Sequence, residues 1–122
     1  MVTLCLSVEL LAEVRDVLTR PKVRLKFPAL TPEAVDAFIT EIGSMATMFD
    51  PVLNQFTWPT DPGDDHILNL AIHAQAEYLV TWETRILHLP LETSKSESIL
   101  RRLAQQLHIV SLEQFALVLQ TL

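Results

Sequence analysis

The sequence predicts an α/β fold in which short parallel strands alternate with helices. Short apolar segments at residues 4–6, 78–81 and 109–110 have the composition of buried strands, and the stretches between them carry apolar residues at helical spacing. The chain has 122 residues, of which 49% are hydrophobic and 20% charged, so it can bury one packed core. Alternation of this kind favours βαβ units with right-handed crossovers. We therefore expect a single domain over residues 1–122.

Capping residues mark two helices in the first half of the chain. Ser7 can cap a helix over residues 8–19, which carries an apolar stripe at helical spacing. Residues 22–27 alternate charged and apolar side chains between prolines, which favours a short helix or a loop. Thr31 opens the next helix, because threonine is a good N-cap and the proline and glutamate that follow suit a first turn. We expect that helix to run to about residue 45.

Turn and capping signals also divide the second half. Residues 54–57 are the candidate for a short strand between two prolines. An acidic turn then leads into a helix that Asp64 can cap and that should run to about residue 75. The buried strand at residues 78–81 and a short helix at residues 84–87 follow.

Two capping-box patterns open the last two helices. In this motif a serine caps the helix, and a glutamate or glutamine three residues later bonds back to it. Ser94 with Glu97 should open a helix to about residue 108, and Ser111 with Gln114 should open the C-terminal helix. The apolar pair between them is expected to form the last strand.

Composition narrows the class of protein. No apolar run approaches the ~20 residues that span a bilayer, so we expect no membrane association. Cys5 is the only cysteine, which rules out an internal disulfide, and we expect it to be a buried packing residue. The start of the chain lacks a signal-peptide pattern, so a reducing cytoplasm is the expected location.

Charge is unevenly distributed along the chain. The formal net charge of −6 argues against general binding to nucleic-acid backbones. Positive charge nevertheless gathers in one short stretch, while acids dominate residues 50–65. Such segregation predicts either a basic patch beside an acidic pocket or an ordinary solvated helix end. The basic stretch comprises Arg15, Arg20, Lys22, Arg24 and Lys26.

Three acidic residues are candidates for a metal site. Asp65 lies in the first turn of a helix, Glu83 follows the buried strand, and Glu13 lies within the first amphipathic helix. The order of elements in residues 61–87 can carry Asp65 and Glu83 to one end of a parallel sheet, where α/β proteins place their sites. Carboxylates that converge there repel one another unless they hold a cation, and Mg²⁺ suits such ligands. The alternative is ordinary: a capping acid, a turn residue and a solvated helix residue.

Other candidate chemistry is weaker. His66 and His73 are seven residues apart, the wrong spacing for a zinc pair on one helical turn. Trp58 and Trp82 can stack on bases, although packing is the commoner use of tryptophan. A small-molecule α/β enzyme is poorly supported, because the chain has 2 glycines, no glycine-rich phosphate loop and no serine or cysteine in a recognisable nucleophile motif.

Several segments, taken in order, resemble the PIN-domain nucleases, in particular the toxin components of toxin–antitoxin systems. The similar segments are residues 7–14 (SVELLAEV), 17–22 (VLTRPK), 61–71 (DPGDDHILNLA), 76–81 (AEYLVT), and the end of the chain at IVS with EQF. The resemblance covers nearly the whole chain. It implies a three-layer α/β/α domain around a short parallel sheet.

The resemblance also implies an activity, the hydrolysis of RNA phosphodiesters by water that Mg²⁺ or Mn²⁺ activates. By motif match the catalytic and metal-binding carboxylates are Glu13, Asp65 and Glu83, and Asp64 is a neighbour that can assist. Arg15 and Arg85 are the candidate substrate contacts. Implied partners are RNA, a cognate antitoxin of a type II system, and a second copy in a homodimer.

The sequence departs from the family pattern at three places. The family begins with a strand that ends in an aspartate, and no such segment precedes Ser7, so we expect an N-terminally truncated domain that lacks one metal ligand. The usual Gly-Asp after the buried strand is Trp82-Glu83, and Arg85 replaces a later aspartate. Two interpretations stay open: a metal-dependent ribonuclease, or a catalytically impaired relic that serves as a protein- or RNA-interaction module.

Overall fold

A computed structural model describes residues 2–121. The chain divides after Val52 into two compact units, called here unit 1 (up to Val52) and unit 2 (from Leu53). Each unit contains helices and one pair of parallel strands. The predicted α/β class is therefore confirmed. The assignment of the whole chain to a single domain stays a prediction.

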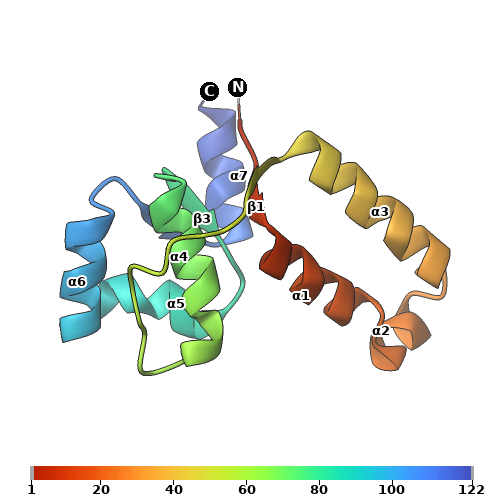
Figure 1. Cartoon of the computed structure of the whole chain (residues 1–122), viewed down its shortest axis with the longest axis horizontal. Coiled ribbons are helices and arrows are strands. Elements are labelled where there is room, and N and C mark those ends of the chain that lie inside the picture. Colours follow the sequence, from red (N-terminus) through yellow and green to blue (C-terminus); the bar gives the residue numbers. More distant parts are fainter. Residues whose placement is uncertain (1, 122) are drawn as a thin grey trace. The chain divides into compact units, whose positions relative to one another are not determined.

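Unit 1 consists of two strands and a helical hairpin between them. Its elements are β1 (Cys5–Ser7), α1 (Val8–Leu18), α2 (Pro21–Lys26), α3 (Pro32–Met45) and β2 (Thr47–Phe49). The helices α1 and α3 lie side by side, with α2 at the bend that joins them (Figure 1). The strands β1 and β2 pair in parallel, with Cys5 opposite Thr47.

The predicted caps form in unit 1. The Ser7 Oγ accepts the Leu10 amide at 3.0 Å, and the Thr31 Oγ1 accepts the Ala34 amide at 3.2 Å. These bonds satisfy amides that a helix start otherwise leaves without a partner. Residues 22–27, left open between helix and loop, fall largely in the helix α2. Cys5 is only half-buried, contrary to the expectation of a buried packing residue.

Unit 2 contains the larger core. Its elements are η1 (Pro62–Asp64), α4 (Asp65–His73), β3 (Tyr78–Val80), α5 (Thr84–His88), η2 (Leu89–Leu91), α6 (Lys95–Leu103), β4 (His108–Val110) and α7 (Leu112–Gln120). The strands β3 and β4 pair in parallel, with Tyr78 opposite His108. Side chains from the segment before η1 and from α4, α5, η2 and α6 form the core. Its buried members are Phe56, Trp58, Leu68, Ile72, Ile86, Leu89, Leu100 and Ala104.

Helix α4 ends in a Schellman motif. Gln75 takes a left-handed conformation with φ of 52°, the Gln75 amide donates to the Ile72 carbonyl, and the Ala76 amide donates to the Ala71 carbonyl. The motif satisfies the last carbonyls of α4 and turns the chain into β3. The position is one that usually holds glycine, since a side chain opposes a positive φ.

Three predicted elements differ in the structure. The short strand expected at residues 54–57 is absent there, and a strand lies instead at Thr47–Phe49. The helix that begins after Ser94 ends at Leu103, five residues early, because the chain must turn before His108 to pair with β3. The strands form two separate pairs rather than one sheet.

The two expected capping boxes have different outcomes. Ser111 and Gln114 form both bonds of the motif. The Ser94 Oγ accepts the Glu97 amide at 3.1 Å, but the Glu97 carboxylate forms an ion pair with Arg101 at 2.7 Å.

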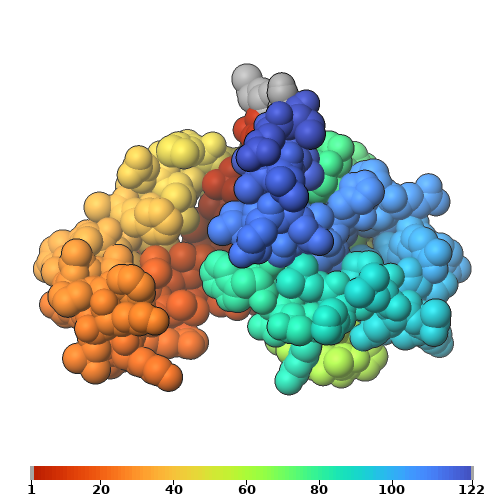
Figure 2. Space-filling model, turned by 180° about the vertical axis from the view of Figure 1, so that it is seen from behind, coloured from red at the N-terminus to blue at the C-terminus, as the bar shows by residue number. Residues whose placement is uncertain are grey.

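Helix α7 lies on the surface of unit 2 (Figure 2). Among residues 2–121, no helix has the length and apolar character needed to span a bilayer.

Candidate carboxylate site

An extended segment of unit 2, residues 53–58, lies along helix α4 and is called here the strap. Its side chains alternate as in a strand, with Phe56 and Trp58 in the core and Gln55 and Thr57 exposed. Its backbone, however, does not pair with a strand. Its amides bond to side chains of α4, which explains why the pattern of residues 54–57 predicts a strand that the structure lacks.

Three polar residues of α4 receive the strap. Asp65, Asn69 and His73 are four residues apart, so they lie on one face of the helix and form what we call the polar ladder. The Leu53 amide donates to the His73 Nδ1 at 3.1 Å, and the Trp58 amide donates to the Asp65 Oδ1 at 2.7 Å. The strap is therefore held at both of its ends.

Asn69 holds the middle of the strap. Its Oδ1 accepts the amides of Gln55 and Phe56 at 2.7 and 2.8 Å. Its Nδ2 lies within hydrogen-bond distance of the Asn54 Oδ1, the Phe56 carbonyl and the Asp65 carbonyl, at 3.1, 2.7 and 3.0 Å. The side chain is 3% exposed, so these bonds form away from solvent. Every polar group of a buried amide is satisfied, which favours one fixed arrangement of strap and helix.

Two of the predicted ligands stand at the start of α4. Asp65 is the first residue of the helix and Asp64 is its N-cap, and both are half-buried. The Asp64 side chain makes no capping hydrogen bond, so the predicted capping role is wrong. Negative charge is favourable at this helix end. The Asp65 carboxylate is fixed through Oδ1 by the strap, and the side chain keeps a second oxygen, Oδ2.

Glu83 lies just after β3, as predicted, at the N-cap position of α5. Its side chain is exposed, and its amide donates to the Thr81 Oγ1 at 3.0 Å. Two residues further on, Arg85 forms an ion pair with Asp61 at 3.2 Å. This pair joins the turn before α4 to the first turn of α5. The pair shows that the segment bearing Glu83 lies close to the turn before Asp64 and Asp65.

The remaining predicted residues lie on α1 in unit 1. Glu13 and Arg15 are both exposed. The Arg15 guanidinium pairs with Asp36 of α3, and Arg20 pairs with Asp16 at 2.8 Å. Two of the five residues in the basic stretch therefore have acidic partners within unit 1. Lys22, Arg24 and Lys26 are exposed on α2 and its end.

The donor chemistry of unit 2 fits a hard divalent cation. Asp64, Asp65 and Glu83 offer carboxylate oxygens, which Mg²⁺ and Mn²⁺ prefer, and Mg²⁺ often takes only one or two protein carboxylates beside water. Among residues 2–121, no group of three or more histidine, cysteine, aspartate or glutamate side chains is arranged to hold a metal. The fit thus extends to a site with one or two protein ligands.

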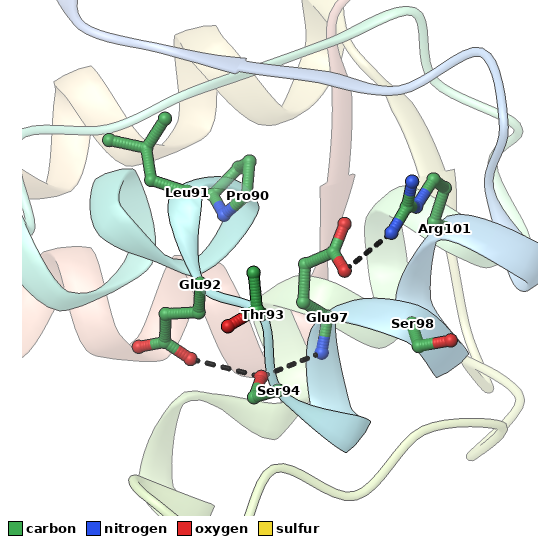
Figure 3. A pocket seen from close by; sticks show the side chains of 8 residues that line it. All are labelled: Pro90, Leu91, Glu92, Thr93, Ser94, Glu97, Ser98 and Arg101. Carbon is green, nitrogen blue, oxygen red and sulfur yellow. Dashed lines mark hydrogen bonds and ion pairs between the residues drawn. The ribbon is translucent and has the colours of Figure 1, made fainter.

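A shallow hollow elsewhere in unit 2 is lined by none of the predicted ligands. It lies between η2 and the start of α6 (Figure 3). Its charged groups are engaged locally: Arg101 pairs with Glu97, and the Ser94 hydroxyl donates to Glu92 at 3.2 Å. We assign no role to this hollow.

Sequence reasoning missed the roles of Asn69 and His73. The signal was present, because polar residues recur every fourth position through a helix that is otherwise apolar except for His66. His73 accepts a strap amide and lies far along the helix from His66. The tryptophans also differ from each other: Trp58 is fully buried, as expected of a packing residue, whereas Trp82 is 86% exposed.

Fold and site together define a small α/β protein with acidic residues at the starts of α4 and α5. The family model described as PIN domain matches residues 1–85, and the chain belongs to this family. The resemblance expected from the sequence is confirmed, and the nuclease-type fold of the family applies to this chain. No curated protein and no solved structure matches the chain.

Proposed function

We propose that this chain is a metal-dependent ribonuclease that hydrolyses RNA phosphodiesters. The observation that carries the proposal is the PIN-domain match over residues 1–85, which includes the paired aspartates at the start of α4. The Asp61–Arg85 ion pair supports it, since it indicates that the segment bearing Glu83 lies beside the turn that leads to those aspartates.

The proposed metal ligands are Asp65 and Glu83 in unit 2, with Asp64 as a neighbour that can assist. Glu13, on α1 of unit 1, is proposed as a further catalytic carboxylate from the family resemblance alone. When bound, Mg²⁺ or Mn²⁺ supplies an activated water and stabilises charge on the phosphodiester. The chain's own part is to fix the carboxylates. Asp65 is the best-fixed of them, since the Trp58 amide binds one of its oxygens.

Substrate contact is proposed for the arginines near these carboxylates. Arg85 and Arg15 are exposed, and a guanidinium can pair with a phosphate through two parallel hydrogen bonds. Each has a carboxylate partner in the free protein, so a phosphate must compete with Asp61 or Asp36. A phosphate can displace these carboxylates readily, because an exposed ion pair contributes little to the free energy of folding.

The biological setting belongs to the same proposal. We propose a toxin of a type II toxin–antitoxin system, acting in the cytoplasm and neutralised by a cognate antitoxin, and able to form a homodimer. Exposed apolar side chains on α7 are the proposed contacts for a protein partner. They are Leu112, Leu117 and Leu119.

The second candidate function is an interaction module without catalysis. One observation favours it: Asp65, the best-placed ligand, already has a structural role as the acceptor for the strap. A PIN-family chain could keep this aspartate for folding alone. The two candidates differ in what they predict for Asp65→Asn, which changes the charge but keeps a side-chain acceptor for the Trp58 amide.

The test combines RNA cleavage with metal-dependent thermal unfolding. The wild-type chain should cleave RNA with Mg²⁺ or Mn²⁺, and either metal should raise its unfolding temperature. Asp65→Asn should lose both effects, while the matched control Asp50→Asn, an exposed aspartate outside the site, should keep both. A wild-type chain that cleaves no RNA with either metal contradicts the enzyme and favours the interaction module.

A further inference from the structure

We infer that Asn69 is a positioning residue for the Asp65 carboxylate, acting through the strap. The inference rests on the proposed function, because it assigns Asp65 to a metal. The chain of contacts has two steps. Asn69 binds the strap at Gln55 and Phe56, and the strap, two residues further on, donates the Trp58 amide to the Asp65 Oδ1.

The first step is rigid because Asn69 is enclosed. Its side chain is 3% exposed, and both its oxygen and its nitrogen bond to strap atoms. The Phe56 backbone is held from both sides, with its amide donating to the Asn69 Oδ1 and its carbonyl accepting from the Asn69 Nδ2. The strap therefore cannot slide along α4 without breaking several buried bonds.

The second step sets the orientation of the carboxylate. The Trp58 amide lies 2.7 Å from the Asp65 Oδ1, and the Trp58 side chain is fully buried, so this amide has a fixed place. A carboxylate with one oxygen bound in this way presents the other in a defined direction. Asn69 also contacts the Asp65 carbonyl at 3.0 Å, which ties the two rungs of the polar ladder to each other.

Metal sites in proteins commonly use residues of this kind, which do not bind the metal but hydrogen-bond to a residue that does. Groups that hydrogen-bond to a ligand orient it, and their loss weakens metal affinity by roughly 10–100-fold. Asn69 is buried and its Oδ1 already accepts two strap amides, so it takes no direct part in binding a cation. Its effect should appear in the affinity of Asp65 for the metal and in the Trp58 amide.

The experiment compares Asn69→Ala with Leu100→Ala. Leu100 is 5% exposed in α6 and is part of the same core, so its truncation lowers stability without removing any of the hydrogen bonds between the strap and α4. Mn²⁺ affinity is measured by the loss of the free-ion signal in electron paramagnetic resonance. A sample labelled with ¹⁵N at tryptophan reports the Trp58 amide directly, because the chain has 2 tryptophans and the exposed Trp82 is an internal reference.

The inference predicts different outcomes for the two variants. Asn69→Ala should weaken Mn²⁺ binding by roughly 10–100-fold and move the Trp58 amide resonance toward its position in Asp65→Ala. Leu100→Ala should leave both close to wild type. If Asn69→Ala changes only the unfolding temperature, as Leu100→Ala does, the inference is overturned.

Failure of the proposed function gives a separate result. A wild-type chain that binds no Mn²⁺ refutes the metal site, and the positioning inference is then decided by the Trp58 resonance alone. If Asn69→Ala does not fold, Asn69→Ser replaces it, because its hydroxyl can donate to the Asp65 carbonyl within the helix while the strap bonds are lost. A Trp58 resonance unchanged in Asn69→Ser overturns the inference.

Discussion

The clearest test of the strap is a pair of substitutions at Asp65 that separate its shape from its charge. Asp65→Ala removes the acceptor of the Trp58 amide, and Asp65→Asn keeps one. A hydrogen bond to a charged group contributes about 1.5–3 kcal/mol, and an acid in the first turn of a helix adds about 0.3–1 kcal/mol. We therefore expect Asp65→Ala to lower the free energy of unfolding by about 2–4 kcal/mol.

Asp65→Asn should be milder. It loses the favourable charge at the helix start and the charged part of the hydrogen bond, which amounts to about 1–2 kcal/mol. Urea unfolding followed by tryptophan fluorescence measures both values without added metal, since Trp58 leaves the core on unfolding. Equal destabilisation by the two substitutions would refute the reasoning, because it would show that the acceptor for the Trp58 amide does not matter.

Three further predictions concern backbone and core. Gly43→Ala should stabilise the chain by about 0.5–1 kcal/mol in thermal unfolding, because a glycine inside a helix is unfavourable. The added Cβ would lie 3.7 Å from the Leu11 Cδ1, which is an ordinary contact. Destabilisation would show that α1 and α3 pack too tightly for the added methyl group. Gln75→Gly should raise stability by roughly 0.5–1 kcal/mol in the same assay, since φ is 52° there, and a loss would contradict the Schellman assignment. Trp58→Phe should lower the free energy of unfolding in urea by about 1–2 kcal/mol, and Trp58→Ala by about 3–5 kcal/mol. The difference is expected because the buried Nε1 has no hydrogen-bond partner among the described residues, and phenylalanine removes this polar group while it still fills most of the space. Similar losses for both variants would show that the indole nitrogen is needed.

Local capping chemistry made much of the fold predictable. Ser7, Thr31 and Ser111 each mark a helix start that the structure confirms, since a side-chain oxygen beside a helical stretch is a short-range signal. The strand β3 was also predictable from its apolar residues. Such elements depend on a few neighbouring residues, so they can be predicted without knowing which other parts of the chain they contact.

Elements that depend on distant partners were missed. The strap has the alternation of a strand, but its amides bond to Asn69 and other side chains of α4 rather than to a neighbouring strand. The helix α6 ends early because His108 must pair with Tyr78. In both places a tertiary contact overrides the local pattern, and one sequence does not reveal which contact will form.

In the candidate site too, local features were predictable from the sequence and tertiary contacts were not. The positions of Asp65 at a helix start and of Glu83 after a strand followed from the order of elements. The Asp61–Arg85 pair and the Trp58 amide on Asp65 were not predictable, because they join residues 24 and 7 positions apart through folded geometry. The family match spans these acidic residues but tests none of them, so their roles remain predictions.

The central claim is that this PIN-family chain hydrolyses RNA with water that a carboxylate-bound metal activates. The most direct measurement is the chemistry of the ends produced from a labelled RNA after removal and controlled return of Mn²⁺. Attack by water leaves a linear phosphate, whereas attack by the ribose 2′-hydroxyl leaves a cyclic one. We predict linear ends that require the metal and are lost in Asp65→Asn. Cyclic ends, or cleavage that continues without metal or in Asp65→Asn, would contradict the account.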